Sequence, residues 1–189
     1  LPEPTAAGLA PLSVKVAETG AAFGVAHDGD ADRAIFVDAQ GRVIDGNITL
    51  GIVTSYFCRK HPGGVVVTPV STSELVKANA ESHGCTTSYT VVGSIYAART
   101  MRKLIEEGKN VIIGGEGNGG IIYPAHQFCR DGGMSAATML SLVAERAVPL
   151  SALIAELPVF TMYQEKRKTG RAAEITAHMK EYFRDCPLD

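Results

Sequence analysis

The sequence predicts an α/β protein: a three-layer α/β/α sandwich with a mainly parallel, mixed sheet. Short runs of β-branched and other apolar residues alternate with helical patterns from residue 65 onward, which is typical of a parallel sheet covered by helices. The chain of 189 residues is 46% hydrophobic and 20% charged, the composition of a folded globular protein. Its 20 glycines exceed the average share and indicate several tight loops.

Charge and cysteine content exclude several classes of protein. The formal net charge is -2 and the pI is about 6.2, so no surface for nucleic acid or an anionic membrane is expected. No apolar run approaches the ~20 residues that span a bilayer. The four cysteines lie far apart without the spacing of zinc ligands, which favours reduced thiols and a cytoplasmic location. The chain begins at Leu1 without the features of a signal peptide, as expected for a piece of a longer protein.

The N-terminal part predicts two helices and several short strands. Apolar residues at helical spacing, followed by glycine, predict a helix over 9–20. The apolar run at 23–26 predicts a strand, and residues 34–44 have the pattern of a hairpin. A further helix is expected to begin at a cap on Asn47 and to end at the His-Pro-Gly-Gly run of 61–64.

The middle of the chain repeats the order strand, helix. Residues 65–67 predict a buried strand, and Ser71 with Glu74 forms a capping box for a helix that ends at Gly84. The next expected elements are a strand over 86–92, a helix over 95–105, a strand over 111–113, a glycine-rich loop over 114–120 and a strand over 121–123.

The C-terminal part predicts two helices and a linker. Asp131 is placed to cap a helix that carries apolar residues from Met134 onward, and Pro149 begins a shorter one. Residues 165–189 are charged with a helical pattern, and we expect them to form a linker.

An acidic loop, DGDADR at 28–33, follows directly on the first expected strand. Asp28, Asp30 and Asp32 alternate with small residues, so a curled loop brings the three carboxylates to one point. Hard oxygen donors of this kind suit Mg²⁺, which completes its shell with water and substrate phosphate. Adjacent carboxylates repel one another unless a cation joins them, which makes a plain solvated turn the weaker interpretation.

Two other families place acidic loops in similar positions. An EF-hand requires glycine at the sixth loop position and glutamate at the twelfth, where this chain has Arg33 and Ala39, so that interpretation fails. A haloacid-dehalogenase-like phosphatase has an Asp-x-Asp pair after a strand, with the first aspartate as nucleophile. That alternative, with Asp28 as nucleophile, stays open, although such enzymes usually continue with threonine or valine where this chain has Ala31.

A second loop, GGEGNGG at 114–120, also follows an expected strand. It lacks the lysine of a phosphate-binding P-loop and the spacing of a dinucleotide-binding motif. Glu116 and Asn118 offer one carboxylate and one amide, which can accept from and donate to neighbouring sugar hydroxyls. A tight hairpin turn explains the loop equally well.

Together the two loops resemble the α-D-phosphohexomutase family, which includes phosphoglucomutases, phosphomannomutases and phosphoglucosamine mutases. The run DGDADR at 28–33 is the most diagnostic part, and GEGNGG at 115–120 is the second. Shorter matches are PEPT at 2–5, Val-Gly at 92–93 and Arg-Asp-Gly at 130–132. The resemblance covers nearly the whole chain.

Members of this family have four domains, and the resemblance implies that this chain holds the central region. Residues 1–45 would be the C-terminal part of domain 2 with the metal loop, and residues 46–165 would be domain 3 with the sugar loop. Residues 166–189 would be a linker towards domain 4. Domains 1 and 4, with the phosphoserine loop and the phosphate-gripping loop, would be missing partners from the same polypeptide, so the chain alone is expected to be inactive.

The same resemblance implies roles for individual residues. Asp28, Asp30 and Asp32 would hold Mg²⁺, and Arg33 would act as a catalytic residue near the transferring phosphoryl group. A salt bridge from Arg33 to a loop aspartate is an equally good interpretation. The residues that would bind the sugar are Glu116, Asn118 and Gly119.

The implied reaction is the reversible conversion of hexose 1-phosphate to hexose 6-phosphate, of the glucose or mannose type, through a phosphoserine enzyme and a bisphosphate intermediate. The expected partner is a phosphorylated hexose, and the cofactor is Mg²⁺. A phosphoglucosamine mutase and a non-catalytic module that binds cations or sugar phosphates remain alternatives. The general base is unassigned, because Ser94 stands where relatives often carry aspartate or histidine and residues 65–71 contain no lysine.

Overall fold

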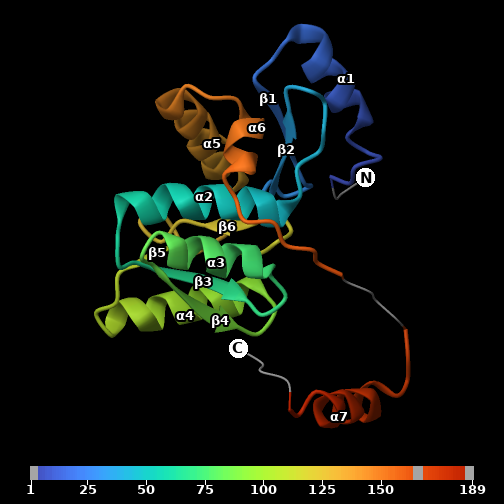
Figure 1. Ribbon diagram of the computed structural model, residues 1–189, viewed down its shortest axis with the longest axis vertical. Helices are drawn as coiled ribbons and strands as arrows, with labels where there is room; N and C mark the ends of the chain where they lie inside the picture. The colour runs from blue at the N-terminus through green and yellow to red at the C-terminus, as the bar shows by residue number, and fades with distance from the viewer. Residues whose placement is uncertain (1–3, 164–167, 186–189) are drawn as a thin grey trace.

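The structure is a computed structural model that describes residues 4–163 and 168–185 (Figure 1). The described helices are α1 (Ala10–Thr19), α2 (Gly46–Lys60), α3 (Glu74–Ser82), α4 (Ser94–Glu106), α5 (Gly132–Arg146), α6 (Leu150–Ala155) and α7 (Ala172–Tyr182). The described strands are β1 (Phe23–His27), β2 (Ala34–Asp38), β3 (Val65–Pro69), β4 (Thr86–Thr90), β5 (Val111–Gly115) and β6 (Ile121–Ile122).

The larger sheet has the strand order β4-β3-β5-β6. Strand β3 pairs in parallel with both β4 and β5, and the short β6 returns antiparallel to β5. Parallel strands end at the same edge, so the segments that follow β3, β4 and β5 gather there. The glycine-rich loop connects β5 to β6 at this edge. The mixed, mainly parallel sheet predicted from the sequence is confirmed.

Helices cover both faces of this sheet and form three layers (Figure 1). Helices α2 and α3 pack together on one face, where Leu50 and Val76 join Val66 and Ile113 in the main core. Helix α4 covers the other face, where Met101 packs with residues such as Val67 and Ile122. Neighbouring residues along β3 therefore point to opposite layers, as the pleat of a strand requires.

A second sheet consists of β1 and β2, which pair antiparallel from Phe23 with Asp38 to His27 with Ala34. The acidic loop is their connection. The hairpin predicted over 34–44 is present only in part, because the second half contributes one isolated bridge, between Val37 and Val43. The reason is length: Asp45 already caps the next helix, so few residues are left to pair.

Two helix starts differ from the prediction. The N-cap of α2 is Asp45, whose carboxylate accepts from the Asn47 N–H (2.8 Å), so Asn47 lies inside the helix. The N-cap of α3 is Ser73, because a turn with a hydrogen bond from the Thr72 N–H to the Pro69 carbonyl (2.9 Å) precedes the helix. Aspartate, asparagine and serine all suit the N-cap position. The pattern alone therefore could not separate Asp45 from Asn47 or Ser73 from Ser71.

The C-terminal part follows the predicted order. Asp131 caps α5, accepting from the Met134 N–H (2.7 Å), and Pro149 precedes α6. Helix α7 buries none of its residues. The linker expected over 166–189 lies partly outside the described residues. Among the described residues, no helix is both long and apolar enough to cross a membrane.

Candidate active site

The acidic loop joins β1 to β2 and brings three carboxylates together. One oxygen from each of Asp28, Asp30 and Asp32 lies within 4.8 Å of the others. The Ala31 N–H donates to the Asp28 carbonyl (3.1 Å), and Ala31 has a φ of 58°, in the left-handed region. This turn curls the loop so that Asp30 points outward while Asp28 is buried.

Arg33, the last residue of the loop, holds Asp28. Its backbone N–H donates to Asp28 Oδ1 (3.1 Å), and its Nε donates to Asp28 Oδ2 (2.5 Å). Burial favours the neutral carboxyl, but the hydrogen bonds and positive charge of Arg33 outweigh it, so the pKa of Asp28 lies below its ordinary value. Of the two roles expected for Arg33, the structure contains the salt bridge, and contact with a phosphoryl group stays a prediction.

A second observation shows that the acidic loop suits a divalent cation. Asp32 Oδ1 is shielded from solvent and no described residue donates a hydrogen bond to it, while Arg33 Nε forms a longer ion pair with it at 3.8 Å. Buried carboxylate oxygens are normally hydrogen-bonded, so an orphan oxygen beside two other carboxylates fits a bound ion. Oxygen donors alone, without sulfur or imidazole, favour Mg²⁺ over zinc or copper.

The glycine-rich loop closes on itself after β5. The Glu116 N–H donates to the Gly120 carbonyl (2.8 Å), and the Gly120 N–H donates to the Asn118 side-chain oxygen (3.1 Å). Gly119 has a φ of 91°, which side chains rarely allow. Glu116 is only 8% exposed, although nothing in a plain hairpin turn requires a buried carboxylate. Contact of Glu116, Asn118 and Gly119 with a sugar stays a prediction.

Close backbone packing joins the two loops. The Ala34 N–H, directly after the acidic loop, donates to the Gly119 carbonyl (3.0 Å). A Cβ at Gly119 would lie 2.7 Å from the Ala34 carbonyl oxygen, and a Cβ at Gly46 would lie 2.3 Å from the Gly117 carbonyl oxygen. Only glycine permits such approaches. The metal loop and the sugar loop predicted from the sequence therefore lie side by side, with the N-terminus of α2 behind the second.

Arg130 links the two loops, and sequence reasoning did not identify it as a site residue. Its Nη2 donates to Asp32 Oδ2 (2.5 Å), and its Nη1 donates to Glu116 Oε2 (2.9 Å). The Arg-Asp-Gly match at 130–132 was the available signal, because an arginine can neutralise nearby carboxylates. The pattern could not show the backbone β-bridge between Arg130 and Ile122 of β6, which positions Arg130 beside both loops.

Other polar side chains near the loops have structural contacts. His27 Nδ1 donates to the Arg33 carbonyl (3.0 Å) and so fixes the end of the acidic loop. His126 Nε2 lies 3.3 Å from Asp131 Oδ2 with half of its side chain exposed.

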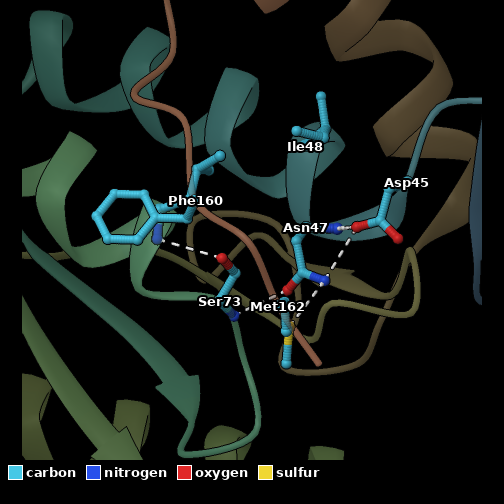
Figure 2. A pocket seen from close by; sticks show the side chains of 7 residues that line it. Asp45, Asn47, Ile48, Ser73, Phe160 and Met162 are labelled. Carbon is cyan, nitrogen blue, oxygen red and sulfur yellow. Dashed lines mark hydrogen bonds between the residues drawn. The ribbon is translucent and has the colours of Figure 1, made fainter. Parts of the chain in front are cut away.

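A cavity of about 310 Å³ lies at the start of α2 and of α3, beside Phe160 and Met162 (Figure 2). Asn47 lies in its wall, where its side chain donates to Asp45 Oδ1 (3.0 Å) and accepts from the Ser73 N–H (3.0 Å). A Cβ on Gly117 would lie 2.2 Å from Asn47 Oδ1, so Asn47 packs directly against the glycine-rich loop. None of the predicted site residues lines this cavity, so it lies outside the candidate site.

Comparison with known proteins decides the family. Residues 45–160 match the family described as phosphoglucomutase/phosphomannomutase, alpha/beta/alpha domain III. The chain belongs to the phosphoglucomutase/phosphomannomutase family. This membership confirms the resemblance to the α-D-phosphohexomutases.

Relatives within the phosphoglucomutase/phosphomannomutase family cover almost the whole chain. It is 39% identical over 181 residues to a phosphoglucomutase/phosphomannomutase of Thermococcus kodakarensis, covering 95% of this chain and 39% of the relative. It is 40% identical over 168 residues to a phosphoglucosamine/phosphogalactosamine mutase of Sulfurisphaera tokodaii, covering 87% and 36%. The chain thus spans less than half the length of these relatives.

A solved structure with the same fold supports the family assignment. A crystal structure described as a putative phosphomannomutase from Thermus thermophilus superposes with a TM-score of 0.75 at 29% identity, covering 82% of this chain and 35% of the other. The phosphoglucomutase/phosphomannomutase fold therefore extends over most of the chain.

Proposed function

We propose that this chain is the central part of a Mg²⁺-dependent phosphohexomutase that interconverts hexose 1-phosphate and hexose 6-phosphate. The observation that carries the proposal is the convergence of the two loops. Three carboxylates suited to a cation lie beside a glycine-rich loop that holds a buried carboxylate, and Arg130 contacts both. A cation that neutralises phosphoryl charge acts on a bound sugar only when the cation site and the sugar contact are adjacent.

The proposed roles follow the chemistry of each side chain. Asp28, Asp30 and Asp32 would hold Mg²⁺, which would neutralise charge on the phosphoryl group. Arg33 holds Asp28 in its ionised form and would lie near the same phosphoryl group. In the other loop, Glu116 and Asn118 would contact the sugar hydroxyls, and Gly119 would complete the sugar-binding loop.

We propose the domain organisation that the resemblance implied. Residues 1–45 would complete domain 2, residues 46–165 would form domain 3, and residues 166–189 would lead to domain 4. The family match over residues 45–160 begins one residue before the proposed domain 3 and ends within it, which supports the first boundary. The phosphoserine that donates the phosphoryl group and the bisphosphate intermediate would involve the rest of the enzyme.

Two substrate types stay within the proposal. The name of the Thermococcus relative favours glucose or mannose phosphates, and the name of the Sulfurisphaera relative favours glucosamine phosphate. The haloacid-dehalogenase-like alternative is not carried forward. Asp28, the nucleophile in that alternative, has both carboxylate oxygens hydrogen-bonded to Arg33. The family that matches the chain is also a different one.

Mn²⁺ binding to the 189-residue chain tests the metal role. We expect weak binding, because the resemblance assigns a further ligand to domain 1, and we expect the Asp30→Asn variant to lose it. Asp185→Asn, which neutralises another exposed aspartate, is the matched control and should bind as the parent does. Electron paramagnetic resonance of free Mn²⁺ gives the bound fraction. Equal binding by Asp30→Asn and the parent would reduce the acidic loop to a turn.

A further inference from the structure

Neighbouring residues hold both the backbone and the side chain of Arg130 in place. Its backbone pairs with Ile122, and the neighbouring Asp131 N–H donates to the Ile121 carbonyl (2.9 Å). The aliphatic part of Arg130 then crosses Gly120, where a Cβ would lie only 2.3 Å from Arg130 Cδ. Gly120 therefore leaves the space through which the guanidinium reaches both loops, and the side chain is only 20% exposed.

The guanidinium donates to one oxygen of each of two carboxylates. Nη2 donates to Asp32 Oδ2, and Nη1 donates to Glu116 Oε2. The other oxygen of Asp32, Oδ1, is the buried atom to which no described residue donates. One oxygen of the carboxylate is thus fixed by Arg130 while the other is left for a ligand. Glu116 is held through its Oε2, and its side chain stays about 10% exposed beside the glycine-rich loop.

We propose that Arg130 is a shared positioning residue that orients Asp32 towards the metal and Glu116 towards the sugar, so that the two loops act as one unit. This inference rests on the metal and sugar roles proposed above. A planar guanidinium suits the task, because its fork of N–H groups donates in two fixed directions at once. Partners of this kind, one step behind a metal ligand, typically change metal affinity by about 10- to 100-fold.

The positive charge of Arg130 repels a bound cation, whereas its orientation of Asp32 favours binding. The direction in which metal affinity changes when Arg130 is replaced therefore separates the two effects. If Arg130 acted only through its charge, it would repel the metal, and its removal would tighten metal binding. Glu116 already neutralises that charge through an ion pair of 2.9 Å, which leaves little net repulsion. The orienting effect should therefore dominate, and removal of Arg130 should weaken metal binding.

The test measures Mn²⁺ affinity of the 189-residue chain in a double-mutant cycle. We expect Arg130→Met to weaken binding by about 10-fold. Arg146→Met, which removes another arginine paired with a glutamate far from the loops, should leave the affinity unchanged. Glu116→Gln should weaken Mn²⁺ binding by at least about two-fold in the parent, although Glu116 is no metal ligand, and should lose this effect in the Arg130→Met background.

Arg130→Lys covers the case in which Arg130→Met fails to fold. Lysine keeps the charge but reaches one carboxylate at a time, so the effect of Glu116→Gln on Mn²⁺ affinity should vanish in this variant as well. Unchanged or tighter binding in Arg130→Met, or a Glu116→Gln effect that persists in both backgrounds, would overturn the inference alone. Binding that survives in Asp30→Asn would overturn the metal role and this inference together.

Discussion

Asp28 illustrates, at the scale of single residues, how the fold keeps a buried carboxylate ionised. Two hydrogen bonds from Arg33 outweigh burial and hold the pKa of Asp28 below its ordinary value. The three aspartates and Glu116 could be found from the sequence, because alternating carboxylates and a lone glutamate among glycines are local patterns. The role of Arg130 was not found in this way, because it depends on the meeting of two loops far apart in the sequence, at Asp32 and Glu116.

The ion pair predicts a pH dependence of stability. Since the folded pKa of Asp28 is depressed, its stabilising contribution is complete above about pH 4 and is lost as the pH falls towards the folded value. Arg33→Met should lower the free energy of unfolding by about 1.5–3 kcal/mol at pH 7. On acidification, the free energy of unfolding of this variant should fall by less than that of the parent. Urea unfolding between pH 7 and pH 3 checks this. Arg171→Met, which removes an exposed pair with Glu174, should show neither effect.

Glu116 carries the prediction about substrate, which requires the full-length enzyme. Glucose and mannose phosphates share the hydroxyls at positions 3 and 4, so one carboxylate that reads these two hydroxyls serves both epimers and both phosphorylated orientations. Glu116→Gln keeps the size but replaces an acceptor oxygen with a donor, at a cost of about 1.5–3 kcal/mol. We expect kcat/KM to fall by about 10- to 100-fold for glucose 1-phosphate and mannose 1-phosphate alike. A loss confined to one epimer would show that Glu116 reads position 2 instead.

Elements place the site through contacts that only small residues allow. The order of strands and helices could be predicted, because apolar periodicity is a local signal. The helix starts at Asp45 and Ser73 were missed, since each competes with a polar neighbour and tertiary contacts decide between them. The docking of α2 onto the glycine-rich loop was also beyond the pattern, because it depends on two glycines that meet in space, Gly46 and Gly117.

Gly46→Ala should separate α2 from the glycine-rich loop. The added Cβ would meet the Gly117 carbonyl oxygen at 2.3 Å, a backbone atom that cannot rotate away. Overpacking of this kind costs about 1–3 kcal/mol. Thermal unfolding followed by circular dichroism gives the change. Gly133→Ala, in the first turn of α5 with no contact under 3.4 Å, is the matched control and should be neutral or stabilising. Equal stability of the two variants would show that the loop gives way without cost.

The whole molecule brings together two sheets that the sequence presents as separate. The antiparallel pair β1-β2 supplies the acidic loop, and the mixed sheet supplies the glycine-rich loop. The backbone hydrogen bond between Ala34 and Gly119 and the two ion pairs of Arg130 hold them against one another. The sequence predicted each loop but not their contact, because no local pattern records which strand ends face each other. The site is therefore a property of how the sheets pack.

This arrangement predicts binding without turnover for the 189-residue chain. Phosphoryl transfer in this proposal needs a phosphoserine donor and a group that grips the distal phosphate, and the resemblance places both in domains 1 and 4. The relatives that match are much longer, since the chain covers 39% of the Thermococcus mutase. Orienting a sugar beside a cation lowers the barrier only when the donor is held in line with the acceptor hydroxyl. We therefore expect no glucose 6-phosphate from glucose 1-phosphate and its bisphosphate activator in a coupled assay, with a full-length relative as the positive control. Formation above a metal-free blank would show that the two loops described here suffice for the reaction.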